Sequence, residues 1–258
     1  MAYPILWHFP VSHFNEKVRW ALDFKRIPHL RKALFLDYMP RALWATGRPT
    51  LPILIVGGKA IGDSTRILEA LEQWHPDPQL YPGDETARRR AVELEDFFDE
   101  ELGHQLRAAL LGPMFVSDPD GVMRSLSLGM NLSARTNRVM RAIFPAFSAF
   151  YCFRHKINAT TVHEGPAKIR AALDRITAEL QPSGYLVGDG FSVADLCAAA
   201  LLSPLVIPKE FQYPIPDPLP RSLAELRSSF SSHPAFLWTE EMYRRHRGAS
   251  AEVQPEGR

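Results

Sequence analysis

The sequence predicts an α+β fold in which a small mixed domain precedes a larger all-helical domain. Short apolar runs alternate with amphipathic stretches over the first 80 residues, and a break rich in proline follows at 75–83. Every later pattern has helical periodicity. We therefore expect domains at 1–79 and 85–247, followed by a disordered tail at 248–258.

The order of elements expected in the first domain is β-α-β-α-β-β-α. Its first helix runs from Ser12, a residue type that caps helices, to Lys25, and Pro28 prevents it from continuing. The Gly57-Gly58 pair between two apolar runs predicts a hairpin, and Asp63 and Ser64 mark the start of the last helix. The expected strands are 5–8, 31–36, 53–56 and 59–61, and the expected helices are 12–25, 40–46 and 64–74.

The second domain contains amphipathic or apolar stretches of helical length. Gly112-Pro113 is expected to end the first of these helices, and 114–137 has little pattern. Ser192 and Asp195 have the spacing of a capping box at the start of a buried helix. The expected helices are 85–111, 139–156, 166–180, 192–202, 224–230 and 234–245, with an irregular, proline-rich stretch at 204–220.

Composition excludes several classes of protein. The chain has 30 Lys+Arg against 29 Asp+Glu, so no basic excess exists to bind nucleic acid. No apolar run reaches the length of about 18 residues that a membrane span needs, and no signal peptide is recognisable, so we expect a cytoplasmic protein. The only cysteines, Cys152 and Cys197, exclude a disulfide scaffold and a four-cysteine zinc site, and we expect no metal. Both are interpreted as buried apolar side chains.

The segment Ser12-His13-Phe14-Asn15-Glu16-Lys17-Val18-Arg19 resembles the active-site turn of the soluble glutathione S-transferase family, in its serine type (theta, zeta, omega and related bacterial classes). A hydroxyl at a helix N-terminus is able to hydrogen-bond a thiolate, which the helix dipole also stabilises. The resemblance makes Ser12 the catalytic residue. The alternative is that Ser12 only caps the helix. Because Ser12 replaces the cysteine of some relatives, a disulfide reductase is disfavoured.

Two further motifs resemble the glutathione-binding segments of the same family. In Thr50-Leu51-Pro52, a cis-proline would turn the backbone of Leu51 outward to pair with the peptide backbone of glutathione. The alternative is a trans proline that begins a strand. Asp63 and Ser64 would hold the ammonium and carboxylate of the γ-glutamyl group, although both also suit a plain helix cap. Arg48, or else Arg41, is a candidate for the glycine carboxylate.

The resemblance implies a thioredoxin-like first domain and a helical domain that forms a hydrophobic pocket. Candidates for the pocket are Met114, Phe115, Phe144, Phe147, Phe150, Tyr151 and Phe153, most of which we interpret as core or dimer-interface residues. The implied function is a detoxifying glutathione S-transferase, a homodimer that transfers glutathione to alkyl or aryl groups. Conjugation, epoxide opening, dehalogenation and ether cleavage remain open. The alternative is a non-catalytic, transferase-like binding or scaffold protein.

Overall fold

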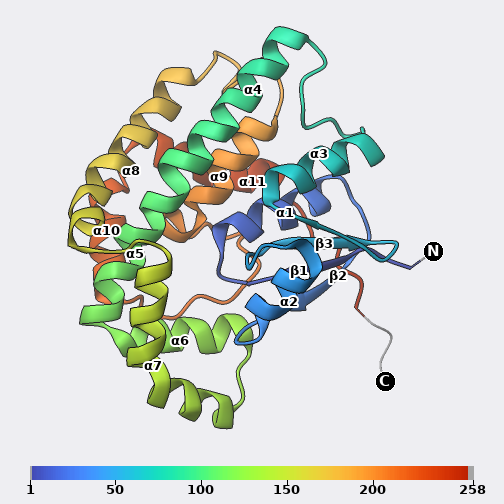
Figure 1. Ribbon diagram of the computed structural model, residues 1–258. Coiled ribbons are helices and arrows are strands. Elements are labelled where there is room, and N and C mark those ends of the chain that lie inside the picture. The colour runs from blue at the N-terminus through green and yellow to red at the C-terminus, as the bar shows by residue number, and fades with distance from the viewer. Residues whose placement is uncertain (1, 255–258) are drawn as a thin grey trace.

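A four-stranded sheet forms the centre of the N-terminal half in this computed structural model, which describes residues 2–254 (Figure 1). The strands are β1 (Ile5–His8), β2 (Leu30–Ala33), β3 (Ile53–Val56) and β4 (Lys59–Gly62), in the order β2-β1-β3-β4. Strand β1 runs parallel to β2 and antiparallel to β3, which forms a hairpin with β4. The predicted sequence of strands and helices is confirmed.

Three helices accompany this sheet. Helices α1 (His13–Phe24) and α3 (Ser64–Trp74) lie between the sheet and the helical domain, whereas α2 (Tyr38–Thr46) lies on the other side (Figure 1). Apolar side chains of α1 and α3 join the main hydrophobic core, among them Val18, Leu22 and Ile67. The N-terminal half is therefore anchored to the C-terminal half through α1 and α3.

The C-terminal half is helical from Glu85 onward. The irregular stretch predicted at 204–220 is present only after Val206, because the preceding helix continues through Pro204. Its elements are α4 (Glu85–Phe97), the π-helical segment η1 (Phe98–Gly103), α5 (His104–Ser117), α6 (Pro119–Met130), α7 (Ala134–Arg154), α8 (Ala159–Glu179), α9 (Val193–Val206), α10 (Arg221–Phe230) and α11 (Pro234–His246). The observed α+β architecture confirms the predicted fold class. The division into domains at 79 and 85 stays a prediction.

Helix α9 forms the centre of the helical core, as its apolar sequence predicts. The capping box is present, because the Asp195 carboxylate accepts the Ser192 backbone N–H at 2.9 Å and its hydroxyl at 2.7 Å. Burial raises the pKa of Asp195 to about 6, although a further bond from the Leu186 N–H favours its charged form. This motif fixes the start of the helix and has no part in the chemistry.

Two expectations about the helices are wrong. Gly112-Pro113 does not end a helix, because α5 continues to Ser117, and a Cβ at Gly112 would lie 2.3 Å from Val162 of α8. The glycine therefore allows close helix packing instead of stopping the chain. The poorly patterned stretch 114–137 contains α6, which begins at an Asp118 cap followed by proline.

The tail is also ordered where disorder was expected. Glu252 forms a parallel β-bridge with His29 beside β2, and the backbone N–H of Val253 donates to the His29 carbonyl at 2.8 Å. Hydrogen bonds to the edge of the sheet hold these residues, which no apolar periodicity marks. The last part of the predicted tail, 255–258, lies outside the described residues. Over residues 2–254, we find no helix with the length and apolarity to cross a bilayer.

Candidate functional site

The strand register brings three of the predicted motifs to one end of the sheet. Trp7 near the end of β1 pairs with Ile53 at the start of β3, and Ile53 pairs with Gly62 at the end of β4. The turn that leads to Ser12, the Leu51-Pro52 segment and the Asp63-Ser64 pair all adjoin these three residues. Segments far apart in the sequence therefore meet where α1 and α3 begin.

Ser12 occupies the N-cap position of α1, with extended backbone angles, but its side chain makes no capping bond. Instead, its Oγ accepts a hydrogen bond from Asn15 Nδ2 at 2.7 Å, and Asn15 Oδ1 accepts the Phe9 backbone N–H at 3.1 Å. This arrangement leaves the Ser12 hydroxyl proton available to a ligand. Asn15 was not among the predicted site residues, although its position three residues after a cap was an available signal.

Arg19, the last residue of the Ser12–Arg19 segment, supports the turn through hydrogen bonds to its backbone. Its guanidinium donates to the backbone carbonyls of Pro10 at 2.9 Å, Phe9 at 3.4 Å and Ser12 at 3.5 Å, and forms an ion pair with Glu16 at 2.8 Å. The Arg19 side chain is fully buried. Since it contacts the backbone that carries Ser12, Arg19 is a positioning residue.

A network of buried charges links this turn to the C-terminal end of the chain. Arg247 donates to Glu16 at 2.7 Å and to Asp23 at 2.8 Å, and Asp23 also pairs with Arg31 at 2.7 Å. Burial alone would raise the pKa of Glu16, but the guanidiniums of Arg247 and Arg19 outweigh it and lower that pKa. The sequence alone does not point to Arg247, because nothing local distinguishes it from neighbouring surface arginines.

The predicted peptide-binding segment has the expected backbone. The Leu51–Pro52 peptide bond is cis. The ladder between β3 and β1 begins at Ile53, so the N–H and C=O groups of Leu51 lie outside it. Leu51 is half-buried and Pro52 is buried, which places them at the margin of the site.

Asp63 and Ser64 lie at the start of α3. Asp63 caps the helix by accepting the Arg66 backbone N–H at 3.3 Å, and its φ of 79° is rare for a residue with a side chain. Such backbone strain concentrates at ligand sites, because only the surrounding structure maintains it. Ser64 is nearly buried at the first turn, where backbone N–H groups are free to bind an anion.

The two candidate arginines for the glycine carboxylate are both exposed. Arg41 pairs with Asp37 at 2.6 Å. Arg48 makes no ion pair within residues 2–254, and follows the left-handed Gly47 that ends α2. Of the two, Arg48 is therefore the cation without an ion pair among the described residues.

The helical domain closes around this end of the sheet. Buried His13 donates from Nε2 to the Gly103 carbonyl at 3.0 Å, and burial lowers the pKa of His13, so its ring is neutral near pH 7. Arg154 of α7 donates to the Pro49 carbonyl at 2.6 Å. A Cβ on Gly129 of α6 would lie 2.6 Å from Val11, next to Ser12. Helices α6 and α7 thus cover the predicted active-site turn.

A second cluster of buried polar side chains joins α1, α4, η1 and α9. Lys17 Nζ contacts Glu95 at 3.2 Å and Asp99 at 2.7 Å, while the Cys197 thiol donates to Asp99 at 3.3 Å. Burial raises the pKa of Cys197 well above its ordinary value, so it stays a thiol. Cys152 is half-buried. Neither cysteine has the environment of a reactive thiolate, and residues 2–254 contain no cluster suited to a metal ion.

The aromatic side chains of the second domain divide between core and surface. Met114, Phe115 and Phe144 are buried in a separate cluster, against which Phe147, Tyr151 and two residues of the first domain, Phe9 and Phe35, pack. This supports their interpretation as core. Phe150 and Phe153 point outward, with exposed fractions of 51% and 86%. The space over Phe9 is therefore filled largely by the protein's own side chains.

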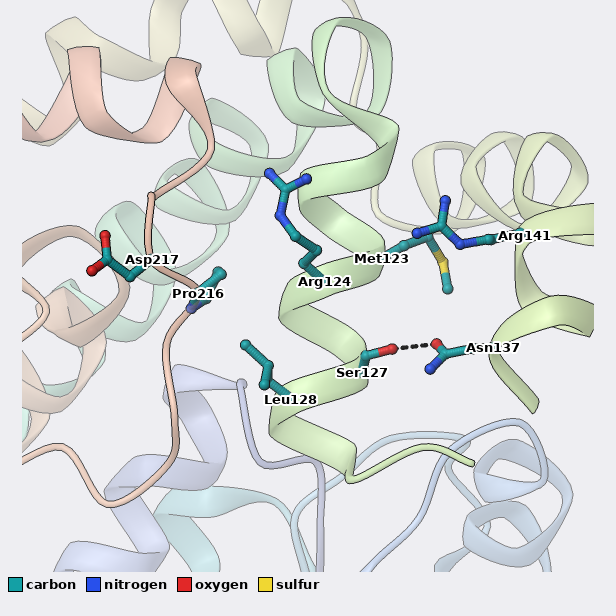
Figure 2. A pocket seen from close by; sticks show the side chains of 8 residues that line it. All are labelled: Met123, Arg124, Ser127, Leu128, Asn137, Arg141, Pro216 and Asp217. Carbon is teal, nitrogen blue, oxygen red and sulfur yellow. Dashed lines mark hydrogen bonds between the residues drawn. The ribbon is translucent and has the colours of Figure 1, made fainter. Parts of the chain in front are cut away.

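A cavity of about 350 Å³ lies apart from the predicted site, between α6, α7 and the segment around Pro216 (Figure 2). Two of its polar groups, Ser127 and Asn137, hydrogen-bond to each other, and Arg141 forms an ion pair with Asp120. The cavity is lined by Met123, Arg124, Ser127, Leu128, Asn137, Arg141, Pro216 and Asp217, none of which belongs to the predicted motifs.

Comparisons with known proteins agree with this geometry. Residues 6–79 match the family model of the glutathione S-transferase N-terminal domain, and residues 139–233 match that of the C-terminal domain. FtsZ-localized protein A from Caulobacter vibrioides is 25% identical over 203 residues, which cover 77% of this chain and 75% of that protein.

Two solved structures have a similar fold. FzlA from C. crescentus superposes with a TM-score of 0.57 at 22% identity, covering 91% of this chain and 90% of that one. A glutathione S-transferase from Methylobacterium radiotolerans, solved with glutathione sulfonate, gives a TM-score of 0.53 at 21% identity, covering 92% and 93%. At this identity, the two likenesses concern the fold alone.

Proposed function

Because the chain belongs to the soluble glutathione S-transferase family, we propose that it binds glutathione and activates the thiol for attack on a hydrophobic electrophile. The observation that carries the proposal is the hydroxyl of Ser12, which stands at the start of α1 with its proton uncommitted. A thiolate placed there would accept this hydrogen bond and the favourable field of the helix.

In this proposal, the other predicted residues bind the rest of glutathione. The backbone of Leu51 beside Pro52 would pair with the cysteinyl unit, as in an added strand. Asp63 and Ser64 would hold the γ-glutamyl end at the N-terminus of α3, and Arg48 would attract the glycine carboxylate. Homodimer formation and a cytoplasmic location stay predictions.

The mechanism assigns the activation of the thiol to the turn before α1. Asn15 donates to the Ser12 oxygen, which polarises the hydroxyl and directs its hydrogen outward. A hydrogen bond to a charged group contributes about 1.5–3 kcal/mol, so the thiolate form of bound glutathione is favoured. The thiolate would then form a carbon–sulfur bond with the electrophile as its leaving group departs or its ring opens.

Steady-state kinetics with a panel of electrophiles tests the proposal. Ser12→Ala should lower turnover about 10- to 100-fold with little change in glutathione affinity, because only the bond to sulfur is lost. Asn15→Asp should also lower turnover, because a carboxylate would accept the Ser12 proton. Equal turnover of Ser12→Ala and the wild type would remove Ser12 from the catalytic role.

A second candidate function is a non-catalytic scaffold. The side chains packed over the Ser12 turn favour the scaffold function, because they occupy space next to the predicted thiol site. Gly129 packs on Val11, and Phe9 stacks on Phe35 with 6.1 Å between ring centroids. The name of the similar FtsZ-localized protein A makes FtsZ assemblies the first partner to test. A thermal shift with millimolar glutathione separates the two functions, because a ligand that binds only the native state raises Tm. No shift would favour the scaffold.

A further inference from the structure

Helix α7 carries apolar side chains on two adjacent faces, of which the fold covers only one. Met140 and Phe144 point into the core of the helical domain. On the other face, Val139, Ile143 and Phe150 are 40–51% exposed, and Phe153 is 86% exposed. Figure 1 places this helix at the edge of the molecule, with α6 beside it. An exposed apolar stripe of this length marks an interaction surface.

The spacing of the exposed residues indicates that the partner which covers them is a helix. Val139, Ile143, Ala146, Phe150 and Phe153 recur at intervals of four, three, four and three residues, and Ala146 is exposed like the others. That is the a/d spacing of a coiled-coil seam, which presents a row of knobs to a second helix, with Pro145 removing one backbone hydrogen bond of α7 beside Ala146. The small side chain of Ala146 at the centre allows a partner helix to approach closely.

The unpaired positive charges around α7 indicate that the partner is acidic. Residues 121–163 contain six Lys or Arg and no Asp or Glu, although the whole chain has a net charge of only +1. Arg124 and Arg141 pair with Asp118 and Asp120. In contrast, Arg135, Arg138 and Lys156 have no ion-pair partner among the described residues. These free cations lie towards the two ends of the stripe, where acidic side chains would complement them.

A second copy of this chain fits the surface poorly. In a parallel pairing of two α7 helices, each arginine would meet its own counterpart. In an antiparallel pairing, Arg135 would approach the Arg154–Lys156 end of the other copy. Like charges placed opposite each other are destabilising. The enrichment of Phe and Arg over Lys is typical of protein interfaces.

We propose that the outer face of α7 is a docking site for an acidic amphipathic helix of another protein. The apolar a/d residues of that helix would cover Ile143, Phe150 and Phe153. Its flanking Glu or Asp side chains would neutralise Arg135, Arg138 and Lys156. This site is separate from the turn that carries Ser12.

Fluorescence anisotropy with a synthetic probe tests the proposal on the full chain. The probe is a labelled three-heptad helix with Leu at a and d and Glu at e and g, and the matched control has Lys in place of Glu. The Glu probe should bind, its affinity should fall with added salt, and the Lys probe should not bind. Equal binding of the two probes would overturn the assignment of an acidic partner.

Variants locate the binding. The double variant Phe150→Ser/Phe153→Ser should weaken the Glu probe about tenfold or more, because exposed aromatic anchors dominate such contacts. Trp44→Ser, which removes an aromatic on α2 that is 87% exposed, should leave binding unchanged. Since both changes are on the surface, a thermal melt should be unaffected. Undiminished binding to the double variant would overturn the proposal.

Two other occupants would give distinct results. If the stripe served a second copy, the wild type would self-associate in sedimentation and the double variant would not, with no binding of the Glu probe. If it served a lipid surface, vesicles of phosphatidylserine and phosphatidylcholine would bind the wild type alone. Either result without probe binding overturns the acidic-helix proposal.

Discussion

Helix α1 buries charged side chains, whereas helix α7 leaves large apolar ones in solvent. Every buried charge of α1 has an oppositely charged partner, and Arg247, far along the chain, is the partner of two of them. The described residues 2–254 leave the outer apolar side chains of α7 40–86% exposed. The buried charges of α1 are Glu16, Lys17, Arg19 and Asp23, and the exposed residues of α7 are Val139, Ile143, Phe150 and Phe153.

This contrast shows that a side chain is buried where the fold supplies it with a partner, even when that side chain is charged. Charges enter the interior of α1 because Arg247 and its neighbours neutralise them, and the resulting network fixes the turn before Ser12. An apolar face that stays exposed indicates a partner outside the chain. We therefore expect substitutions in α1 to damage the fold and the site, and substitutions on the outer face of α7 to damage only binding.

Removal of Arg247 should have the largest effect. Arg247→Met would leave Glu16 and Asp23 buried without their shared cation, which should cost about 3–5 kcal/mol of unfolding free energy. Chemical denaturation measures this loss. Arg244→Met, an exposed arginine in the helix that ends just before Arg247, is the matched control and should leave the midpoint unchanged. Equal midpoints for the two variants would show that the network does not support the fold.

The two faces of α7 should respond very differently to truncation. Phe144→Ala leaves a cavity at a buried position and should lower the free energy of unfolding by about 3–5 kcal/mol. Phe153→Ala, on the opposite face, should change stability by less than about 0.5 kcal/mol. Urea denaturation of both variants tests the pair. A large loss of unfolding free energy in Phe153→Ala would mean that the outer face of α7 is covered within the fold.

A smaller effect is expected where α6 contacts the active-site turn. Gly129→Ala would place a Cβ 2.6 Å from Val11, and the resulting shift should cost about 1–3 kcal/mol. If the turn moves, glutathione-dependent turnover should fall as well. Gly190→Ala, where an added Cβ meets nothing within 4 Å, is the control. Unchanged stability of Gly129→Ala would contradict the close packing of α6 on this turn.

The part of the pH dependence of stability that comes from the Arg247 network should be modest and should run in one direction. The pKa values of Glu16 and Asp23 are lowered, because Arg247 and nearby guanidiniums outweigh the effect of burial. Their contribution is therefore fully present above the unfolded-state pKa of about 4, and is lost as the pH falls through the lower folded-state values. Thermal melts of the wild type should show this loss in acid, and Arg247→Met should show less of it. The same loss of stability in acid for the wild type and Arg247→Met would contradict the role given to Glu16 and Asp23.

Much of the N-terminal half could be predicted from sequence because its signals are local. Caps, a glycine pair and apolar alternation define the elements, and Ser12, Leu51 and Asp63 lie where short motifs predict. Asn15 was missed although the signal was local, because its side chain contacts the turn and not the helix. Arg247 could not be found, since its partners are more than 200 residues away.

The helical half was harder to predict for two physical reasons. Glycine and proline were interpreted as helix breakers at Gly112-Pro113, but close packing on Val162 explains the glycine and the helix continues. The order of the tail depends on backbone hydrogen bonds to His29, which no pattern of side chains encodes. Both errors arise from tertiary contacts that outweigh local propensity.

The state of the thiol in bound glutathione tests the central claim most directly. A spectroscopic pH titration of the thiolate, with glutathione bound to the wild type and to Ser12→Ala, measures its pKa in each. We predict a pKa lowered below that of free glutathione in the wild type, and a return towards the free value in Ser12→Ala, with glutathione still bound. The same thiol pKa in both proteins, or a wild type that does not bind glutathione, would contradict the account.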